Sequence, residues 1–199
     1  MTESIYWDSI GFDSKGRETD RTHWVGHSFL TQYYQVLFVY ERSAYGSTVS
    51  TPGIFDTSGV SQTLINNPGG GNIMSTQAGV GLNTYGIQVG TGAGANTGAT
   101  SALTTLVANG VAGGQLSYGA MGITFPTGTA PLSYTFTRTL TNASGADIIL
   151  SEIGLTYAMA NVATAEVYVM CIRDVLSPTV TVSNGGFRTF TGTKQYTIA

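Results

Sequence analysis

The clearest pattern in the chain is a strict alternation between residues 132 and 141, which read Leu-Ser-Tyr-Thr-Phe-Thr-Arg-Thr-Leu-Thr. Every odd position in this run is Ser or Thr, and the even positions are Leu, Tyr, Phe, Arg and Leu. Successive side chains of a β-strand point to opposite faces. The run therefore predicts a strand with one buried face and one face that carries hydroxyl groups.

Related runs predict further strands in the same half of the chain. They cover residues 84–91, 115–125, 147–157, 166–175, 179–183 and 187–198. Turn sequences lie between them, such as Asn142-Ala143-Ser144-Gly145 and Asn184-Gly185-Gly186. In the 115–125 run the apolar face changes sides near Gly119 and Gly122, which predicts a bulge. Short strands separated by regular turns indicate an all-β fold, an antiparallel β-sandwich or jelly roll.

One short helix is predicted over residues 28–42. Apolar side chains recur there at helical spacing, at Phe29, Tyr33, Val36, Leu37 and Tyr40. The density of Val, Phe and Tyr would also suit a strand. The run is long and has no turn residue before Gly46, so we favour the helix. Beyond it, shorter strands are predicted at residues 47–50, 54–57 and 62–66.

The first 27 residues differ in character from the rest. Eight charges of mixed sign fall within the first 21 positions, and the apolar residues are isolated. A segment of this kind buries too little area to fold alone. We expect an extended N-terminal arm over residues 1–27, anchored on a neighbour by Trp7 and Phe12; the alternative is a loop packed on its own domain. Residues 28–199 are then a single β-sandwich domain.

Charge is absent from the middle of the chain. Residues 57–137, 81 consecutive positions, contain no Asp, Glu, Lys, Arg or His. A monomer relies on mixed surface charge to stay dispersed, so we interpret the chain as an assembly subunit whose neutral surface is covered by other copies. The stretch 92–100 contains only Gly, Ala, Thr and Asn. We expect this loop either to be mobile or to lie against another subunit.

Composition excludes several classes of partner. The net charge is −3 and Lys and Arg are not clustered, so direct nucleic-acid binding is not expected. No run of 18 apolar residues exists, so no membrane span is expected. The polar N-terminus lacks the apolar core of a Sec signal peptide. Cys171 is the only cysteine, which excludes an intrachain disulfide and a cysteine zinc site.

Candidate catalytic chemistry is weak. His23 and His27 have the spacing of two zinc ligands on a helix but lack a third. The glycine-rich stretches are not followed by the Lys-Ser/Thr of a phosphate loop. No carboxylates converge by spacing, and Cys171 lies in an apolar strand, where a thiol is most often core. We therefore predict no enzyme, no metal and no cofactor. Sugar stacking by the 21 aromatic residues is the alternative function, that of an extracellular glycan-binding module or adhesin.

A series of short motifs in the second half adds a resemblance. The motifs are Tyr85-Gly86-Ile87-Gln88-Val89-Gly90-Thr91-Gly92, Gln115-Leu116-Ser117-Tyr118-Gly119, Phe136-Thr137-Arg138-Thr139, Thr141-Asn142-Ala143-Ser144-Gly145-Ala146, Glu152-Ile153-Gly154-Leu155, Arg173-Asp174-Val175 and Tyr196-Thr197-Ile198. From about residue 84 to the end, their order and spacing resemble a family of virion structural proteins of tailed phages. The resemblance implies a non-enzymatic component of the virion, made in the host cytoplasm. Its partners would be copies of itself and other virion proteins, with capsid decoration or coat as the first placement and a neck or tail component as the second.

Six residues are the candidate subunit contacts: Trp7, Phe12, Trp24, Arg138, Arg173 and Asp174. For Arg173 and Asp174, which end a predicted strand, a local ion pair is the open alternative.

Overall fold

A computed structural model describes residues 2–26, 29–42, 48–49, 54–65, 74–124, 132–163 and 165–197. The elements are β1 (Thr2–Phe12), β2 (Glu18–Gly26), α1 (Thr31–Arg42), β3 (Thr48–Val49), β4 (Leu64–Ile65), β5 (Gly86–Gly90), β6 (Ser117–Tyr118), β7 (Gly122–Ile123), β8 (Leu132–Thr141), β9 (Ile148–Ala160), β10 (Glu166–Val182) and β11 (Phe187–Thr197). The prediction of an all-β fold with antiparallel sheets and one short helix is confirmed.

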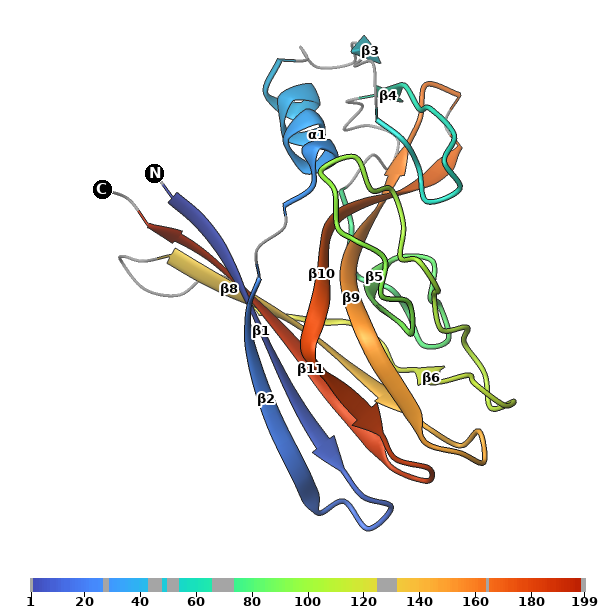
Figure 1. Cartoon of the computed structure of the whole chain (residues 1–199). Coiled ribbons are helices and arrows are strands. Elements are labelled where there is room, and N and C mark those ends of the chain that lie inside the picture. Colours follow the sequence, from blue (N-terminus) through green and yellow to red (C-terminus); the bar gives the residue numbers. More distant parts are fainter. Residues whose placement is uncertain are drawn as a thin grey trace.

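Two sheets enclose the core (Figure 1). The larger has the strand order β2-β1-β11-β8-β6, with β7 also paired to β8, and the smaller has the order β10-β9-β5. Trp7, Phe136 and Phe190 of the larger sheet share one buried cluster with residues of the smaller sheet such as Leu155 and Val169. The rings of Trp7 and Phe136 meet edge to face, with centroids 5.8 Å apart. Burial of apolar area between the two sheets is the main stabilising term of this arrangement.

Strand β8 shows why the alternation predicted its position. Phe136, Arg138 and Leu140 are buried, whereas the hydroxyl residues between them are partly exposed. The predicted bulge is also confirmed. The predicted strand over residues 115–125 forms as two short strands, β6 and β7. Tyr118 lies opposite Leu140 and Gly122 lies opposite Thr137, so the three residues between β6 and β7 face two residues of β8.

The expected N-terminal arm is not what the structure shows. Strand β1 pairs with β11 along its whole length, from Thr2 opposite Thr197 to Phe12 opposite Phe187, and β2 pairs with β1. The charges of this segment do not mark an unfolded arm. Most of them lie on the turn and the exposed face of a hairpin, Glu3 and Asp20 pair with buried cations, and Ile5 and Trp7 alternate into the core.

The helix is confirmed, with a later start at Thr31. Tyr33 and Val36 are buried as the helical spacing required. The predicted strand at 54–57 is wrong: a single bridge forms there, between Phe55 and Ser61. The carboxylate of Asp56 accepts hydrogen bonds from the backbone N–H groups of Ser58 and Val60, and such local bonding turns a chain out of an extended course.

The buried thiol of Cys171 generates a prediction about alkaline stability. Burial raises the pKa of this thiol well above its ordinary value, although nearby Lys194 opposes the shift. In the unfolded chain a thiol ionises near pH 8.5, so its contribution to the free energy of unfolding is constant below that pH. Above it the contribution falls, by roughly 2 kcal/mol at pH 10.

We therefore expect urea unfolding to show a steeper loss of stability between about pH 8 and pH 10 in the wild type than in Cys171→Ala. The other groups that titrate in this pH range are present in both proteins, so their contributions to the pH dependence of stability cancel when the two slopes are compared. Equal slopes would show that the thiol ionises in the folded protein as readily as in the unfolded one.

Candidate subunit interface

The candidate contact residues lie mostly inside the chain. The exposed fraction is 0% for Trp7, 0% for Arg173, 1% for Arg138, 7% for Asp174 and 8% for Trp24. Phe12 is half-buried and stacks on Phe187 of the same chain, with centroids 4.6 Å apart. Side chains at this depth are not available to a neighbouring copy. For the five buried residues the prediction of a subunit contact is corrected, because they pack inside the fold, whereas for the half-buried Phe12 it stays a prediction.

Arg138 extends from β8 into the uncharged segment and binds its backbone. Its guanidinium donates to five carbonyl oxygens, those of Gly119 at 2.9 Å, Ile87 at 3.0 Å, Tyr85 at 3.1 Å, Gly79 at 3.4 Å and Leu82. It also lies over the Tyr118 ring, 4.8 Å from the centroid. Burial lowers the pKa of Arg138 to about 10, which still leaves it protonated at neutral pH. One cation therefore binds three separate stretches of the chain.

Arg173 and Glu152 form a second buried centre, between β10 and β9. Arg173 Nη2 lies 2.7 Å from Glu152 Oε2, and neither side chain is exposed. The carboxylate also accepts the N–H groups of Thr104 at 3.0 Å and Thr105 at 2.8 Å. A buried ion pair is tolerated when further hydrogen bonds satisfy both partners, and here the loop backbone supplies them.

The loop at 92–100 packs on this ion pair. Arg173 donates to the carbonyl oxygens of Gly94 at 2.9 Å and Ala95 at 3.3 Å, and Asn96 Nδ2 donates to the Arg173 carbonyl at 2.5 Å. A Cβ on Gly92 would lie 2.8 Å from Glu152 Oε1, so only glycine allows the backbone this close. The chain's own side chains therefore hold the inner side of the loop, whereas residues 93, 95 and 97–99 are exposed, and the expectation that another subunit covers the loop stays a prediction.

The local ion pair between Arg173 and Asp174 is not formed either. Adjacent residues of a strand point to opposite faces, and Arg173 pairs with Glu152. Asp174 Oδ2 instead accepts the indole N–H of Trp7 at 2.8 Å.

Two more cations, Arg188 and Lys194, are buried. Arg188 pairs with Asp20 at 2.6 Å, and Lys194 pairs with Glu3 at 2.6 Å. Lys194 lies 4.1 Å from the centroid of the Tyr33 ring, which attaches α1 to the larger sheet. Four of the eight Lys and Arg residues are therefore buried: Arg138, Arg173, Arg188 and Lys194. The exposed cations among the described side chains are Lys15, Arg17 and Arg21, all at the β1–β2 hairpin.

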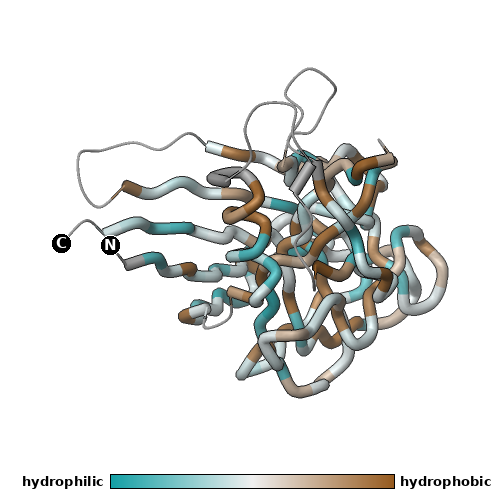
Figure 2. The backbone as a smooth tube through the Cα atoms, turned by 90° about the horizontal axis from the view of Figure 1, so that it is seen from above, coloured by the Kyte–Doolittle hydropathy of each residue, from teal (hydrophilic) through white to brown (hydrophobic). Residues whose placement is uncertain are grey.

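The surface formed by the uncharged segment also carries large apolar side chains. The exposed ones among its described residues are Val60, Val80, Leu82, Leu106, Val111, Ile123 and Leu132. In Figure 2 the strands that run toward the termini are mostly white to teal, and brown residues are more frequent on the opposite side, which holds the buried strands β9 and β10 as well as loops of the uncharged segment. The molecule is thus polarised, with a charged hairpin at one end and a nearly neutral loop surface elsewhere.

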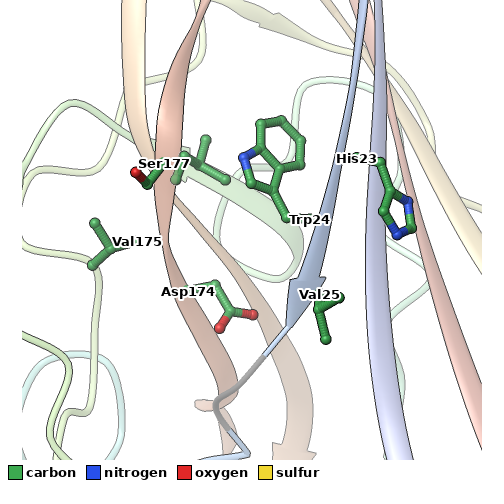
Figure 3. Close-up of a pocket in the computed structure, with 7 residues that line it drawn as sticks. His23, Trp24, Val25, Asp174, Val175 and Ser177 are labelled. Atoms are coloured by element: carbon green, nitrogen blue, oxygen red, sulfur yellow. The ribbon is translucent and has the colours of Figure 1, made fainter.

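A pocket of 330 Å³ lies between β2 and β10 (Figure 3). His23, Asp174 and Ser177, the residue types of a hydrolytic triad, all line it. However, Figure 3 shows the imidazole of His23 and the hydroxyl of Ser177 pointing apart, and His23 Nδ1 lies 2.8 Å from Asp8 Oδ1 on the hairpin. The arrangement does not present a nucleophile to a base.

Metal ligands do not gather in the described part of the chain, where no group of three His, Cys, Asp or Glu residues could hold an ion. His27, the partner of His23 in the spacing noted above, lies outside the described residues. Within the same described ranges, no helix has the length and apolar character that crossing a bilayer requires.

Comparisons with protein-family models, curated proteins and solved structures find no match for this chain.

The Arg173–Glu152 centre generates a stability prediction. Replacement of Arg173 by Met leaves the Glu152 carboxylate buried without its partner, so we expect the free energy of unfolding to fall by about 3–5 kcal/mol. The double variant Arg173→Met/Glu152→Gln removes the charge as well and should recover part of the loss. Urea denaturation measures both.

Arg17→Met is the matched control, because Arg17 pairs with Asp13 at an exposed site. We expect it to cost less than about 1 kcal/mol. An equal effect of the two arginine substitutions would contradict the role given to the buried centre.

Proposed function

We propose that this chain is a structural subunit of a phage virion, which acts by packing against copies of itself and other virion proteins. One observation carries the proposal: the surface is even less charged than the sequence suggests. Half of the basic residues are buried, and the 81-residue segment that adds no charge exposes large apolar side chains. The resemblance of the second half to virion structural proteins supports the same class.

The free-energy cost of covering a protein surface depends on how much charge the surface carries. A contact that buries ions must remove their hydration, whereas hydroxyl and apolar side chains can be covered at little cost. A specific contact removes at least about 1,000 Å² of total surface from water. In a symmetric particle each modest contact is repeated many times, so the contacts act together. A neutral surface is therefore suited to repeated burial.

The proposal places the chain in the virion after synthesis in the host cytoplasm. Capsid decoration or coat is the first placement, and a neck or tail component is the second. The mechanism is shape and burial and requires neither catalysis nor a cofactor.

A glycan-binding module or adhesin is the second candidate function. One observation favours it, since Tyr34 and Phe38, one turn apart on α1, are both exposed and could stack on sugar rings. Many other aromatic rings are buried in the core, among them Trp7, Tyr118 and Phe136, and are not available for this purpose.

Sedimentation velocity of the purified chain separates the two functions. A virion subunit should sediment as a higher oligomer or form regular assemblies that electron microscopy can image. A glycan-binding module should remain a monomer and be retarded on a glycan column. A chain that stays monomeric at its highest soluble concentration would overturn the proposal of an assembly subunit.

A further inference from the structure

Two neighbouring loops of the uncharged segment carry the two most exposed large apolar side chains among its described residues, Val80 and Val111, and also the exposed Leu82. The loops are residues 79–82 and 109–116, here called the neutral loop surface. The exposed fraction is 79% for Val80, 63% for Val111 and 46% for Leu82. The loops lie side by side, because a Cβ on Gly81 would be 3.6 Å from Asn109 Nδ2. Both also bind Tyr118, whose carbonyl accepts from Gly81 N and whose N–H donates to Asn109 Oδ1.

The buried Arg138 holds both ends of the first loop, residues 79–82. The guanidinium of Arg138 donates to the carbonyl oxygens of Gly79 and Leu82, at the two ends of the loop. Val80 is therefore displayed on a backbone that a buried cation fixes at both ends. A contact made through such a loop loses little conformational entropy, because the loop is already ordered.

The second loop is closed by its own hydrogen bonds. Gly110 N donates to the Leu116 carbonyl at 3.1 Å, and Gln115 N donates to the Ala112 carbonyl at 3.0 Å. The Gln115 side chain accepts from Ala112 N at 3.1 Å. Val111 thus stands at the tip of a closed loop and not on a loose strand of chain.

We propose that the neutral loop surface docks on the same surface of a second copy, around a two-fold axis. This inference rests on the proposed function and names the surface that performs it. The choice of occupant follows from charge. Every side chain that these loops present is neutral, so a partner with charged groups at the contact would have to bury them without counter-charges.

A suitable partner surface must therefore be free of charge, and the neutral loop surface of a second copy is. When the two copies meet through this surface, apolar side chains are buried against apolar side chains and no like charges come together. The β1–β2 hairpin is charged and is therefore not a suitable partner for the neutral loop surface. A contact of one surface with its own copy is isologous, so it closes as a dimer and leaves other surfaces free for further assembly.

The test introduces charge into the contact. The double variant Val80→Asp/Val111→Asp places four carboxylates in a two-fold interface, and we expect self-association to weaken at least about 100-fold. Ile149→Asp is the matched control, because Ile149 is an exposed apolar residue of β9 outside these loops. It should leave association unchanged. Sedimentation measures association, and circular dichroism verifies that each variant is folded.

A mixing experiment tests the symmetry. Val80→Lys/Val111→Lys should dissociate like the Asp variant, and an equimolar mixture of the two should associate again. This follows because opposite charges meet only where the surface faces its own copy. No recovery on mixing would overturn the two-fold contact.

The remaining outcomes separate this inference from the proposed function. If the wild type associates and the Asp variant associates equally well, the neutral loop surface is not the contact and the proposed function stands. If the wild type does not associate at all, both fail.

Discussion

The structure depends on buried cations that bind backbone carbonyl groups. Arg138 and Arg173 extend from the sheets into a segment that has no charge of its own. An irregular segment leaves many N–H and C=O groups without the partners that a sheet would supply. A guanidinium has five donors in a fixed plane and can satisfy several carbonyls at once. Arg138 and Arg173 therefore stabilise the uncharged segment from inside the chain and add no charge to the surface of that segment.

This division of roles connects fold and function. Before β8 begins at Leu132, the long uncharged segment forms no long strand in its described part, where its strands are β4 to β7, of two to five residues. It covers the smaller sheet as loops, and those loops are fixed from the inside by Arg138, Arg173 and Glu152. The described loops thus form a neutral surface that is held by contacts on its inner side.

Some of this could be predicted from the sequence. The alternation in residues 132–141 located β8, and the change of apolar face near Gly119 located the bulge. Both signals are local, and local patterns survive folding. The position of β1 could not be predicted in this way, because its partner β11 lies at the other end of the chain. The charges of the hairpin also concealed the short alternation of Ile5 and Trp7.

The two buried arginines differ in the same respect. Arg138 falls on the apolar face of an alternating strand, between Phe136 and Leu140, so its burial could have been inferred. Arg173 lies in a stretch of β10 that is buried on both faces, where alternation gives no information. Its partner Glu152 and its loop acceptors come from distant segments. Only the folded chain brings them together.

The pairing of the first strand with the last has a consequence for synthesis. As the chain leaves the ribosome, β1 and β2 appear first but cannot complete the larger sheet until β11 follows. Contacts this far apart in sequence slow folding, since a long loop must close before they form. Trp7 therefore remains without its core neighbours for most of the period of translation, and during this period chaperones have the greatest opportunity to bind.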